Sequence, residues 1–422
     1  MGAYRMGRLI LSVIIFLCVY ISFAVVREKR FLWVWGGIIL LYLLRIISPL
    51  ESIRLVNWNI IGIFAGTLLV AELLVESGLP SAVASFLSRK AKNVGWAILY
   101  LSILSGFVSS FTENVATVLL LAPIAFELAK RMKVSPVPFL VSISISSNLQ
   151  GTATLVGDPP SIILADFCKL TFNDFFFLHG KPGIFFAVEI GALFSFLYLY
   201  YVFRKYTGKA GEMEKKKIED VFPIILFCGL IAFLVLVSSR REMFEKIGGL
   251  GTMLFGLLGV LVRGRDGKVL KRFDWETLLI LCGIFILVGT LEKVGAIELA
   301  ARKLGGFTKG SIFLTYLLLV VASVAFSAFI DNVPYVTAMI PVGMEMANTL
   351  GMEPYLFAFG IVIGATVGGN ITPIGASANL VAFGLLRKKR YNITFLDFVK
   401  LGLPFTILAV GSACVFLWFV WR

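Results

Sequence analysis

The chain has 422 residues, of which 59% are hydrophobic and only 15% are charged. A soluble protein of this length needs more charge to cover its surface, so the composition excludes an ordinary soluble domain. Mean hydropathy is +0.93, and the net charge of +14 is spread over short loops without a basic, aromatic-rich face, which argues against nucleic-acid binding.

Apolar segments of bilayer-spanning length recur along the whole chain. In the first half we expect spans at 9–26, 31–47 and 58–77, a short amphipathic stretch near 79–92, an interrupted block at 94–130, an interrupted span at 137–167 and a span at 182–203. The first segment lacks a small-residue cleavage site and runs into a charged stretch, so we interpret it as a span and not as a signal peptide.

A polar run at 204–220 is the clearest linker in the sequence, and after it the pattern starts again. In the second half we expect spans at 221–239, 246–262 and 275–293, a short stretch near 296–304, an interrupted block at 307–347, an interrupted span at 354–386 and a final span at 401–421. The predicted domains are therefore an N-terminal repeat (1–203), a cytoplasmic linker (204–220) and a C-terminal repeat (221–422).

The repeat is visible residue by residue. Residues 106–161 align without a gap onto 324–379, and 15 of the 56 pairs are identical. The identical pairs include Asn114/Asn332, Pro123/Pro341 and Gly157/Gly375, and Glu113 falls on Asp331. Shared apolar composition would match leucine or valine, whereas matched Asn, Pro, Thr and Gly indicate an internal structural repeat.

Each interrupted block is either two full spans or one re-entrant hairpin. We favour hairpins because the polar clusters around Glu113 and Asp331 make poor external turns but suitable buried tips. Both alternatives give an odd number of crossings per half, so the second repeat would be inverted, as in many secondary transporters. With hairpins and a cytoplasmic loop at 27–30, 25 of the 39 Lys and Arg residues fall in cytoplasmic loops, as the positive-inside rule requires.

The predicted fold is thus an all-α integral membrane protein with two inverted repeats. Each repeat would have five transmembrane helices, a re-entrant hairpin and a broken helix. Non-helical backbone at membrane depth must be buried or line a cavity, and the hairpin tips and the glycine-rich breaks at 148–160 and 366–379 require such backbone. The free N–H groups at a break attract anions, and the free carbonyl groups coordinate Na⁺.

We expect the substrate or the coupling ion to contact residues at the tips and breaks. In the first half these are Glu113, Asn114, Asn148, Gly151, Thr152, Thr154, Gly157 and Asp158, and in the second half Asp331, Asn332, Gly369, Asn370, Thr372, Gly375 and Asn379. Asn114, Gly157, Asn332 and Gly375 are the candidate positions for bound Na⁺.

The carboxylates are the most informative members of this set. A carboxylate inside a bilayer is costly and usually functional, so Glu113 and Asp331 are candidates for ion coordination or proton coupling. The alternative is that they cap the second helix of each hairpin, and the two roles can coexist. Asp158 is either a site residue or a turn former, and for Glu127 and Glu345, near the hairpin ends, we favour snorkelling to the membrane interface.

Metal-centre, disulfide and enzyme functions find little support in the sequence. His179 is the only histidine, and the cysteines are far apart without a C-x-x-C motif: Cys18, Cys168, Cys228, Cys282 and Cys414. An intramembrane aspartyl protease would need Asp158 and Asp331 facing each other on spans, but Asp158 precedes two prolines. We therefore expect no enzymatic activity and no cofactor apart from a coupling ion.

At these motifs the chain resembles the ion transporter superfamily of arsenite permeases, the melanosomal P protein, D-type sodium–proton antiporters and divalent anion–sodium symporters. The stretch 151–160 resembles the P-protein and arsenite-permease pattern, 331–334 resembles the P protein and the antiporters, and 369–375 resembles the arsenite-permease break. The resemblance implies a homodimer, a scaffold from the first three spans of each half, a transport domain of hairpins and broken spans, and an elevator-like motion.

The residues at the hairpin tips limit the range of candidate substrates. Dicarboxylate symporters of this superfamily carry Ser-Asn-Thr at both tips, whereas this chain has 113–115 Glu-Asn-Val and 331–333 Asp-Asn-Val. Because an acidic pair would repel a dianion, we do not expect citrate or succinate uptake. We expect a cell-membrane secondary transporter of a small inorganic anion or a weak oxyacid such as arsenite or silicic acid, coupled to Na⁺ or H⁺. A sodium–proton antiporter is the main alternative, and a channel is a further one.

The first testable prediction concerns topology: ten crossings, two hairpins and both termini outside. A single cysteine introduced near Lys215 should react with a membrane-impermeant thiol reagent only when the cytoplasmic face is exposed. Labelling of that cysteine from the outside of intact cells would contradict the topology.

Overall fold

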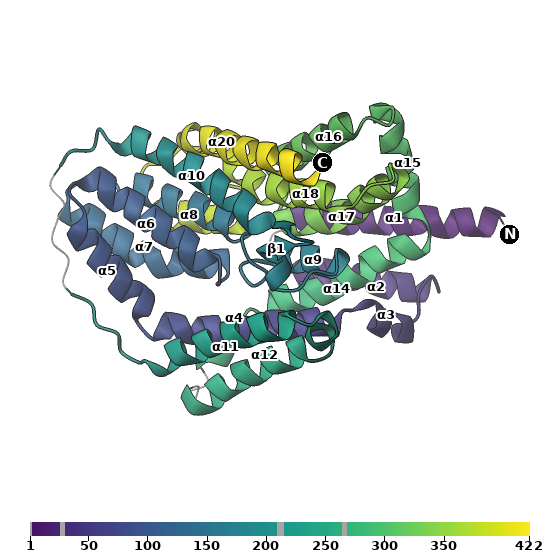
Figure 1. Ribbon diagram of the computed structural model, residues 1–422, viewed down its shortest axis with the longest axis horizontal. Helices are drawn as coiled ribbons and strands as arrows, with labels where there is room; N and C mark the ends of the chain where they lie inside the picture. The colour runs from purple at the N-terminus through teal and green to yellow at the C-terminus, as the bar shows by residue number, and fades with distance from the viewer. Residues whose placement is uncertain (1, 26–29, 209–214, 264–267) are drawn as a thin grey trace.

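The computed structural model describes the whole chain except residues 1, 26–29, 209–214 and 264–267 (Figure 1). Most of the expected loop at 27–30 and parts of the expected loops at 204–220 and 263–272 therefore lie outside the described residues. The described chain is almost entirely helical, and its long helices run in roughly the same direction through the molecule (Figure 1).

The helices of the first half follow the expected order. They are α1 (Gly2–Val25), α2 (Arg30–Leu43), α3 (Pro49–Leu55), α4 (Trp58–Glu76), α5 (Leu79–Lys90), α6 (Val94–Ser109), α7 (Asn114–Arg131), α8 (Val137–Gln150), α9 (Pro159–Phe167) and α10 (Ile184–Phe203). A 3-10 turn, η1 (Asn173–Phe175), and two short antiparallel strands, β1 (Phe177–Leu178) and β2 (Lys181–Pro182), join α9 to α10.

The second half repeats this order. Its elements are α11 (Phe222–Ser238), α12 (Arg241–Arg263), α13 (Lys268–Arg272), α14 (Trp275–Lys293), α15 (Ala296–Thr308), α16 (Ile312–Ser327), α17 (Asn332–Thr349), α18 (Tyr355–Gly368), η2 (Gly369–Ile371), α19 (Ser377–Lys388) and α20 (Phe395–Trp421). Helices α7 and α17, and likewise α9 and α19, begin 218 residues apart, which is the spacing of the sequence repeat.

The two interrupted blocks fold as helix pairs. Helix α6 contacts α7, and α16 contacts α17, with non-helical links at 110–113 and 328–331. The pair α6–α7 lies toward one end of the molecule and the pair α16–α17 toward the opposite end (Figure 1). The two interrupted spans are broken as expected, between α8 and α9 and between α18 and α19.

Five of the described helices are long and apolar enough to cross a membrane: α4, α10, α12, α14 and α20. The pair α15–α16 passes the same test as one unit but is bent by 115°. Helices α2 and α11 and the stretch Met6–Val19 of α1 are apolar but shorter. The ten expected crossings would need these three and the two broken spans in addition, so the count of ten stays a prediction.

Two short helices and the small β-hairpin were not expected. Helix α3 begins with a capping box, in which Ser48 and Glu51 exchange side-chain-to-backbone hydrogen bonds around Pro49. Lys293 at the end of α14 donates to Glu51 at 2.6 Å. This hydrogen bond and one from the backbone of Ser48 hold the pKa of Glu51 at about 2. The contact fixes α3 to the end of α14.

Glycines allow the backbones of α4 and α12 to pack closely against each other. A Cβ atom on Gly62 would lie 2.8 Å from the carbonyl oxygen of Gly249, and one on Gly66 would meet the backbone carbonyl of Thr252. Asn59 accepts a hydrogen bond from the Gly249 N–H at 2.7 Å. Small residues allow such backbone approach between helices in an apolar medium.

We expect Gly66→Ala to force α4 and α12 apart and to lower the free energy of unfolding by about 1–3 kcal/mol. The matched control is Gly36→Ala on α2, because Gly36 is exposed and a Cβ there would meet no atom within 4 Å. Thermal unfolding of both purified variants in detergent measures the difference. Equal unfolding temperatures would contradict the close contact.

Candidate functional site

Both hairpin tips and both helix breaks meet around one central cavity of about 80 Å³. Asn114 and Asn332, which correspond in the sequence repeat, line the same cavity, as do Glu113, Asp158 and Asp331. Its remaining lining residues come from α2, α8, α14, the start of α17 and the two breaks: Arg30, Asn148, Pro159, Pro160, Thr277, Ile280, Val333, Ala376, Ser377 and Ala378.

The first hairpin tip is ordered by side-chain hydrogen bonds. Glu113 is the N-cap of α7, and its Oε2 accepts from the Ala116 N–H at 2.8 Å. The Ser109 hydroxyl donates to Asn114 Oδ1 at 2.5 Å. The Asn114 amide in turn points to Asp158 Oδ2 at 3.5 Å, the outer limit of a hydrogen bond. The tip and the first break thus share one polar cluster.

The first break is held by Asp158 at one end and by backbone carbonyls at the other. Asp158 is the N-cap of α9 and accepts from the Ser161 N–H at 3.2 Å and the Ser161 hydroxyl at 2.9 Å. A Cβ on Gly157 would lie 3.0 Å from the Ser109 carbonyl oxygen and closer still to that of Gly151. Only glycine therefore fits where these two carbonyls converge.

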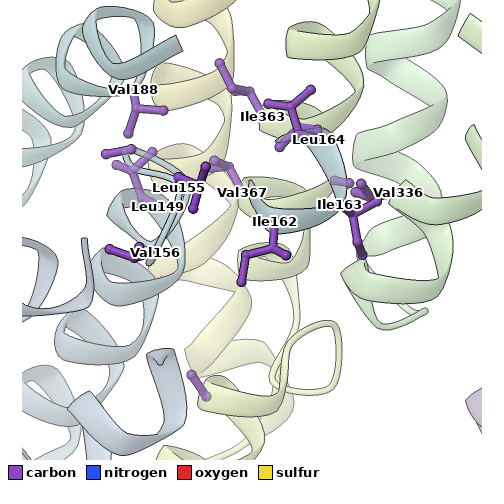
Figure 2. Packing of buried hydrophobic residues seen from close by; sticks show 14 of the residues in the cluster. Leu149, Leu155, Val156, Ile162, Ile163, Leu164, Val188, Val336, Ile363 and Val367 are labelled. Atoms are coloured by element: carbon purple, nitrogen blue, oxygen red, sulfur yellow. The ribbon is translucent and has the colours of Figure 1, made fainter. Parts of the chain in front are cut away.

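Buried apolar side chains anchor the first break from behind. Leu155 and Val156 lie near Leu149 of α8 and Val188 of α10 (Figure 2). The first turns of α9 present further aliphatic side chains to α17 and α18 (Figure 2), through Ile162, Ile163, Leu164, Val336, Ile363 and Val367. The non-helical backbone is therefore fixed in place by the core.

The second tip differs from the first in its charge balance. Asp331 is the N-cap of α17, with Oδ1 accepting from the Val333 N–H at 3.3 Å. Its Oδ2 accepts from the Ser377 hydroxyl at 3.0 Å and from Arg30 Nη1 at 3.0 Å. Arg30 is the first residue of α2, so an ion pair joins α2 to the second hairpin tip.

Equivalent residues in the two breaks make equivalent contacts. Thr154 donates its hydroxyl to the Ser110 carbonyl, and Thr372, 218 residues later, donates to the Ala328 carbonyl. A Cβ on Gly375 would lie 2.6 Å from the Gly369 carbonyl oxygen and 2.7 Å from that of Ser327 (the residues that correspond to Gly151 and Ser109). The repeat seen in the sequence is thus present in the hydrogen bonds.

A cluster of three amide side chains connects the two halves. Asn148 Nδ2 donates to Asn370 Oδ1 at 2.8 Å and to Asn379 Oδ1 at 2.9 Å. Asn370 Nδ2 donates to the Ile145 carbonyl at 2.9 Å. All three amides are buried, and only Asn148 among them also lines the central cavity. This cluster fixes the two broken helices against each other.

The structure divides the predicted site residues into two groups. Those that line the central cavity are Glu113, Asn114, Asn148, Asp158, Asp331 and Asn332. Those that support it from behind are Gly151, Thr152, Thr154, Gly157, Gly369, Asn370, Thr372, Gly375 and Asn379. Glu127 and Glu345, which we had placed at the membrane interface, lie away from the cavity lining; Glu127 pairs with Arg131 at 2.8 Å.

Arg30, Thr277 and Ser377 were not among the expected site residues. Ser377 lies inside the second glycine-rich break and was therefore recognisable by position. Arg30 and Thr277 start α2 and α14, which lie outside the aligned repeat, so the sequence offered no signal for either.

The polar groups that line the cavity are carboxylates, side-chain amides, hydroxyls and one guanidinium. Within the described part of the chain, no group of three or more His, Cys, Asp or Glu side chains is placed to share a metal ion. The oxygens that converge at Gly157 and Gly375 belong to backbone carbonyls, which suit a hard cation such as Na⁺.

Two cavities larger than the central one lie among the described residues. A cavity of about 740 Å³ shares Glu113, Thr277 and Ser377 with it and is also lined by Glu72 and Asp274. The other, of about 790 Å³, shares no lining residue with the central cavity. It is lined in part by Arg54, Asn57, Asp166, Glu292, Glu298 and Glu345. The central site is therefore adjacent to only one of the two.

Comparison with known families places this site in a transporter. The family model described as "Citrate transporter" (CitMHS) matches residues 19–362. The chain belongs to this citrate transporter family. An uncharacterized transporter of Mycobacterium tuberculosis is 30% identical over 97% of this chain and 98% of its own length. The human P protein is 23% identical over 86% of this chain and 53% of its own length.

Solved structures share the fold. YdaH of Alcanivorax borkumensis, a transporter, superposes with a TM-score of 0.58 at 17% identity and covers 90% of this chain and 88% of its own. MtrF of Neisseria gonorrhoeae, from a class of antimetabolite efflux pumps, has a TM-score of 0.59 at 15% identity, with 98% and 95% coverage. This member of the citrate transporter family is therefore a multi-pass membrane transporter, and the expected superfamily resemblance is confirmed.

We expect Thr372→Val to lower the free energy of unfolding by about 1–3 kcal/mol, because it leaves the Ala328 carbonyl without its hydroxyl donor. The control is Thr349→Val, whose hydroxyl bonds to an exposed carbonyl in the last turn of α17. Thermal unfolding of the two variants compares the losses. Equal destabilisation of Thr372→Val and Thr349→Val would mean that the hydrogen bond across the break contributes no more to stability than an exposed one.

Proposed function

We propose that this chain is a secondary active transporter of a small inorganic anion or weak oxyacid, such as arsenite or silicic acid, coupled to H⁺ or Na⁺. The central cavity carries the proposal, because it gathers the tips of both hairpins, both helix breaks and three carboxylates. Ionisable residues and broken helices at membrane depth are the features of transport sites.

The size and charge of the cavity favour a small substrate. Its volume of about 80 Å³ is small beside the cavity of about 740 Å³ that adjoins it. Three carboxylates and one guanidinium line it, so its formal charge is negative before any coupling ion binds. A multiply charged carboxylate such as citrate would meet repulsion there, whereas a weak oxyacid can enter without charge.

The packing of the helices supports an elevator-type division into two domains. Helices α4, α11 and α12 pack together along one side of the molecule, and α14 packs against α1 and α2 (Figure 1). Helices α6, α8 and α10 form a second group with α16, α17, α18 and α20. We assign the first set to the scaffold and the second to the transport domain, in a homodimer with inverted repeats.

The conformation supports a cytoplasm-facing state. The cavity of about 740 Å³ that adjoins the central site is lined by Arg272 at the end of α13 and by Asp274 and Trp275 at the start of α14. Arg272 ends the basic loop 263–272, which the charge distribution assigns to the cytoplasm, and the other two residues follow it. Solutes would thus reach Glu113 and Ser377 from that side in this state.

Coupling is assigned to the carboxylates and to the carbonyl clusters. A carboxyl group at a desolvated tip can carry a proton when no cation is bound, and Glu113 lines both the central cavity and the adjoining one. Asn114 and Gly157 in the first half, and Asn332 and Gly375 in the second, mark where Na⁺ would bind instead. The choice between H⁺ and Na⁺ is decided by flux measurements.

We expect Glu113→Gln and Asp331→Asn each to abolish or uncouple transport while the protein remains folded. Glutamine and asparagine keep the shape and can still cap α7 and α17, but they cannot exchange a proton or a cation. The measurement is flux of arsenite, silicate, phosphate and citrate into proteoliposomes at several pH values, with and without a Na⁺ gradient, alongside thermal unfolding.

The matched control is Glu127→Gln, because Glu127 forms an exposed ion pair with Arg131 within α7 and such pairs contribute little. Wild-type flux with an unchanged pH profile in both site variants would show that the carboxylates only cap helices. A proton signal on addition of Na⁺ alone would replace the proposal by a sodium–proton antiporter.

A further inference from the structure

The start of α2 contributes a charge to the central cavity. Arg30 is the only lysine or arginine among the described residues that line this cavity, and its Nη1 lies 3.0 Å from Asp331 Oδ2. The pair is largely withdrawn from solvent, with 18% of the Arg30 side chain and 10% of the Asp331 side chain exposed. Removing one partner of such a pair leaves the other charge buried without compensation, which is costly.

The pair adds a charged contact between two helix groups that also touch where α4 meets α9 and where α14 meets α17. Helix α2 packs chiefly against α1 and α14, whereas Asp331 belongs to the tip between α16 and α17. Thr277 and Ile280 of α14 line the cavity beside Arg30. The guanidinium therefore reaches across from the proposed scaffold to the proposed transport domain.

Asp331 keeps other partners if Arg30 moves away. Its Oδ1 accepts from the Val333 N–H, and its Oδ2 accepts from the Ser377 hydroxyl. A guanidinium presents five N–H donors in a planar fork that matches the oxygens of a carboxylate or an oxyanion. An anion in the cavity can thus take over Arg30 without leaving Asp331 unbonded.

We propose that Arg30 is a specificity-determining residue that binds the anionic group of the substrate in competition with Asp331. In the empty state, Asp331 occupies the guanidinium and ties the second hairpin tip to α2. A bound oxyanion replaces Asp331 on Arg30 and thereby frees the hairpin tip from the proposed scaffold. The exchange would keep an empty transport domain from moving, which is the behaviour that an exchanger of two solutes requires. The proposal rests on the proposed function and narrows its substrate to anions.

Competition predicts opposite effects at the two partners. Arg30→Gln removes the recognition group and should weaken anion binding by about tenfold or more, the loss of a charge-assisted hydrogen bond. Arg30→Lys should retain part of the affinity, since it keeps the charge but loses the fork. Asp331→Asn removes the competitor and should bind the anion several-fold more tightly than wild type, even though it transports less.

The test is a titration of the purified protein with anions. Binding is measured as the rise in the thermal unfolding temperature. The probes are phosphate, arsenate, sulfate and citrate as sodium salts, each compared with sodium chloride at equal ionic strength. Arg302→Gln is the matched control, because its exposed pair with Glu298 lies within α15 and Arg302 does not line any of the three cavities described above. It should titrate like wild type.

A double variant controls for misfolding of Arg30→Gln, in which the Asp331 carboxylate loses its charged partner. Arg30→Gln combined with Asp331→Asn removes both charges and should bind anions as weakly as Arg30→Gln alone. Restored affinity in the double variant would show that the pair is only structural. Weaker binding in Asp331→Asn, or no stabilisation of wild type by any probe anion, would also overturn the proposal.

Failure of this proposal is distinguishable from failure of the proposed function. Binding is measured without transport, so an absence of anion binding together with arsenite flux would leave a transporter of uncharged oxyacids. Anion binding with opposite shifts in the two variants, but without flux of any tested solute, would leave the recognition role of Arg30 intact.

Discussion

The structure depends on one constraint: backbone groups that leave the helix inside a membrane must find partners within the protein. The chain leaves the helix at two tips and two breaks, and it brings all four together. Thr154 and Thr372 lie in the breaks, and each donates a hydrogen bond to a carbonyl at the neighbouring hairpin tip. Glycine at 157 and 375 lets further carbonyls approach. The same backbone groups that need partners thereby become the oxygen ligands of a candidate ion site.

The carboxylates show that helix capping and ion handling use the same geometry. Glu113, Asp158 and Asp331 are all N-caps, so each accepts a backbone N–H at the positive end of a helix and each also lines the cavity. A capped carboxylate is held in one orientation, which is useful for a group that must repeatedly bind and release a cation or a proton. Capping therefore does not argue against a transport role.

The internal repeat explains how much of the site was predictable. Tip and break residues carry chemically distinctive matches at a fixed spacing, so Asn114, Asn332, Gly157 and Gly375 stood out from the apolar background. The Arg30–Asp331 ion pair did not stand out, because Arg30 lies outside the aligned stretch 106–161. A cation at the start of an apolar segment resembles any loop residue until the fold places it beside Asp331. Helix α3 was recognisable from its capping box, whereas α13 was not.

The two halves have the same order of helices, tips and breaks, but their charged residues differ. At the repeat spacing Asp158 corresponds to Ala376, and Ser161 to Asn379, so the first half has two cavity carboxylates where the second has one. Asp331 is balanced by Arg30, while no ion pair with Lys or Arg is formed by Glu113 or Asp158 among the described residues. Uncompensated charge in a low-dielectric site is costly unless a cation or proton binds it. The first half therefore has the stronger electrostatic demand for a mobile cation, and the second half, with its built-in guanidinium, is the half suited to an anion. A frame that is symmetric in shape and asymmetric in charge can in this way bring a cation and an anion into one cavity.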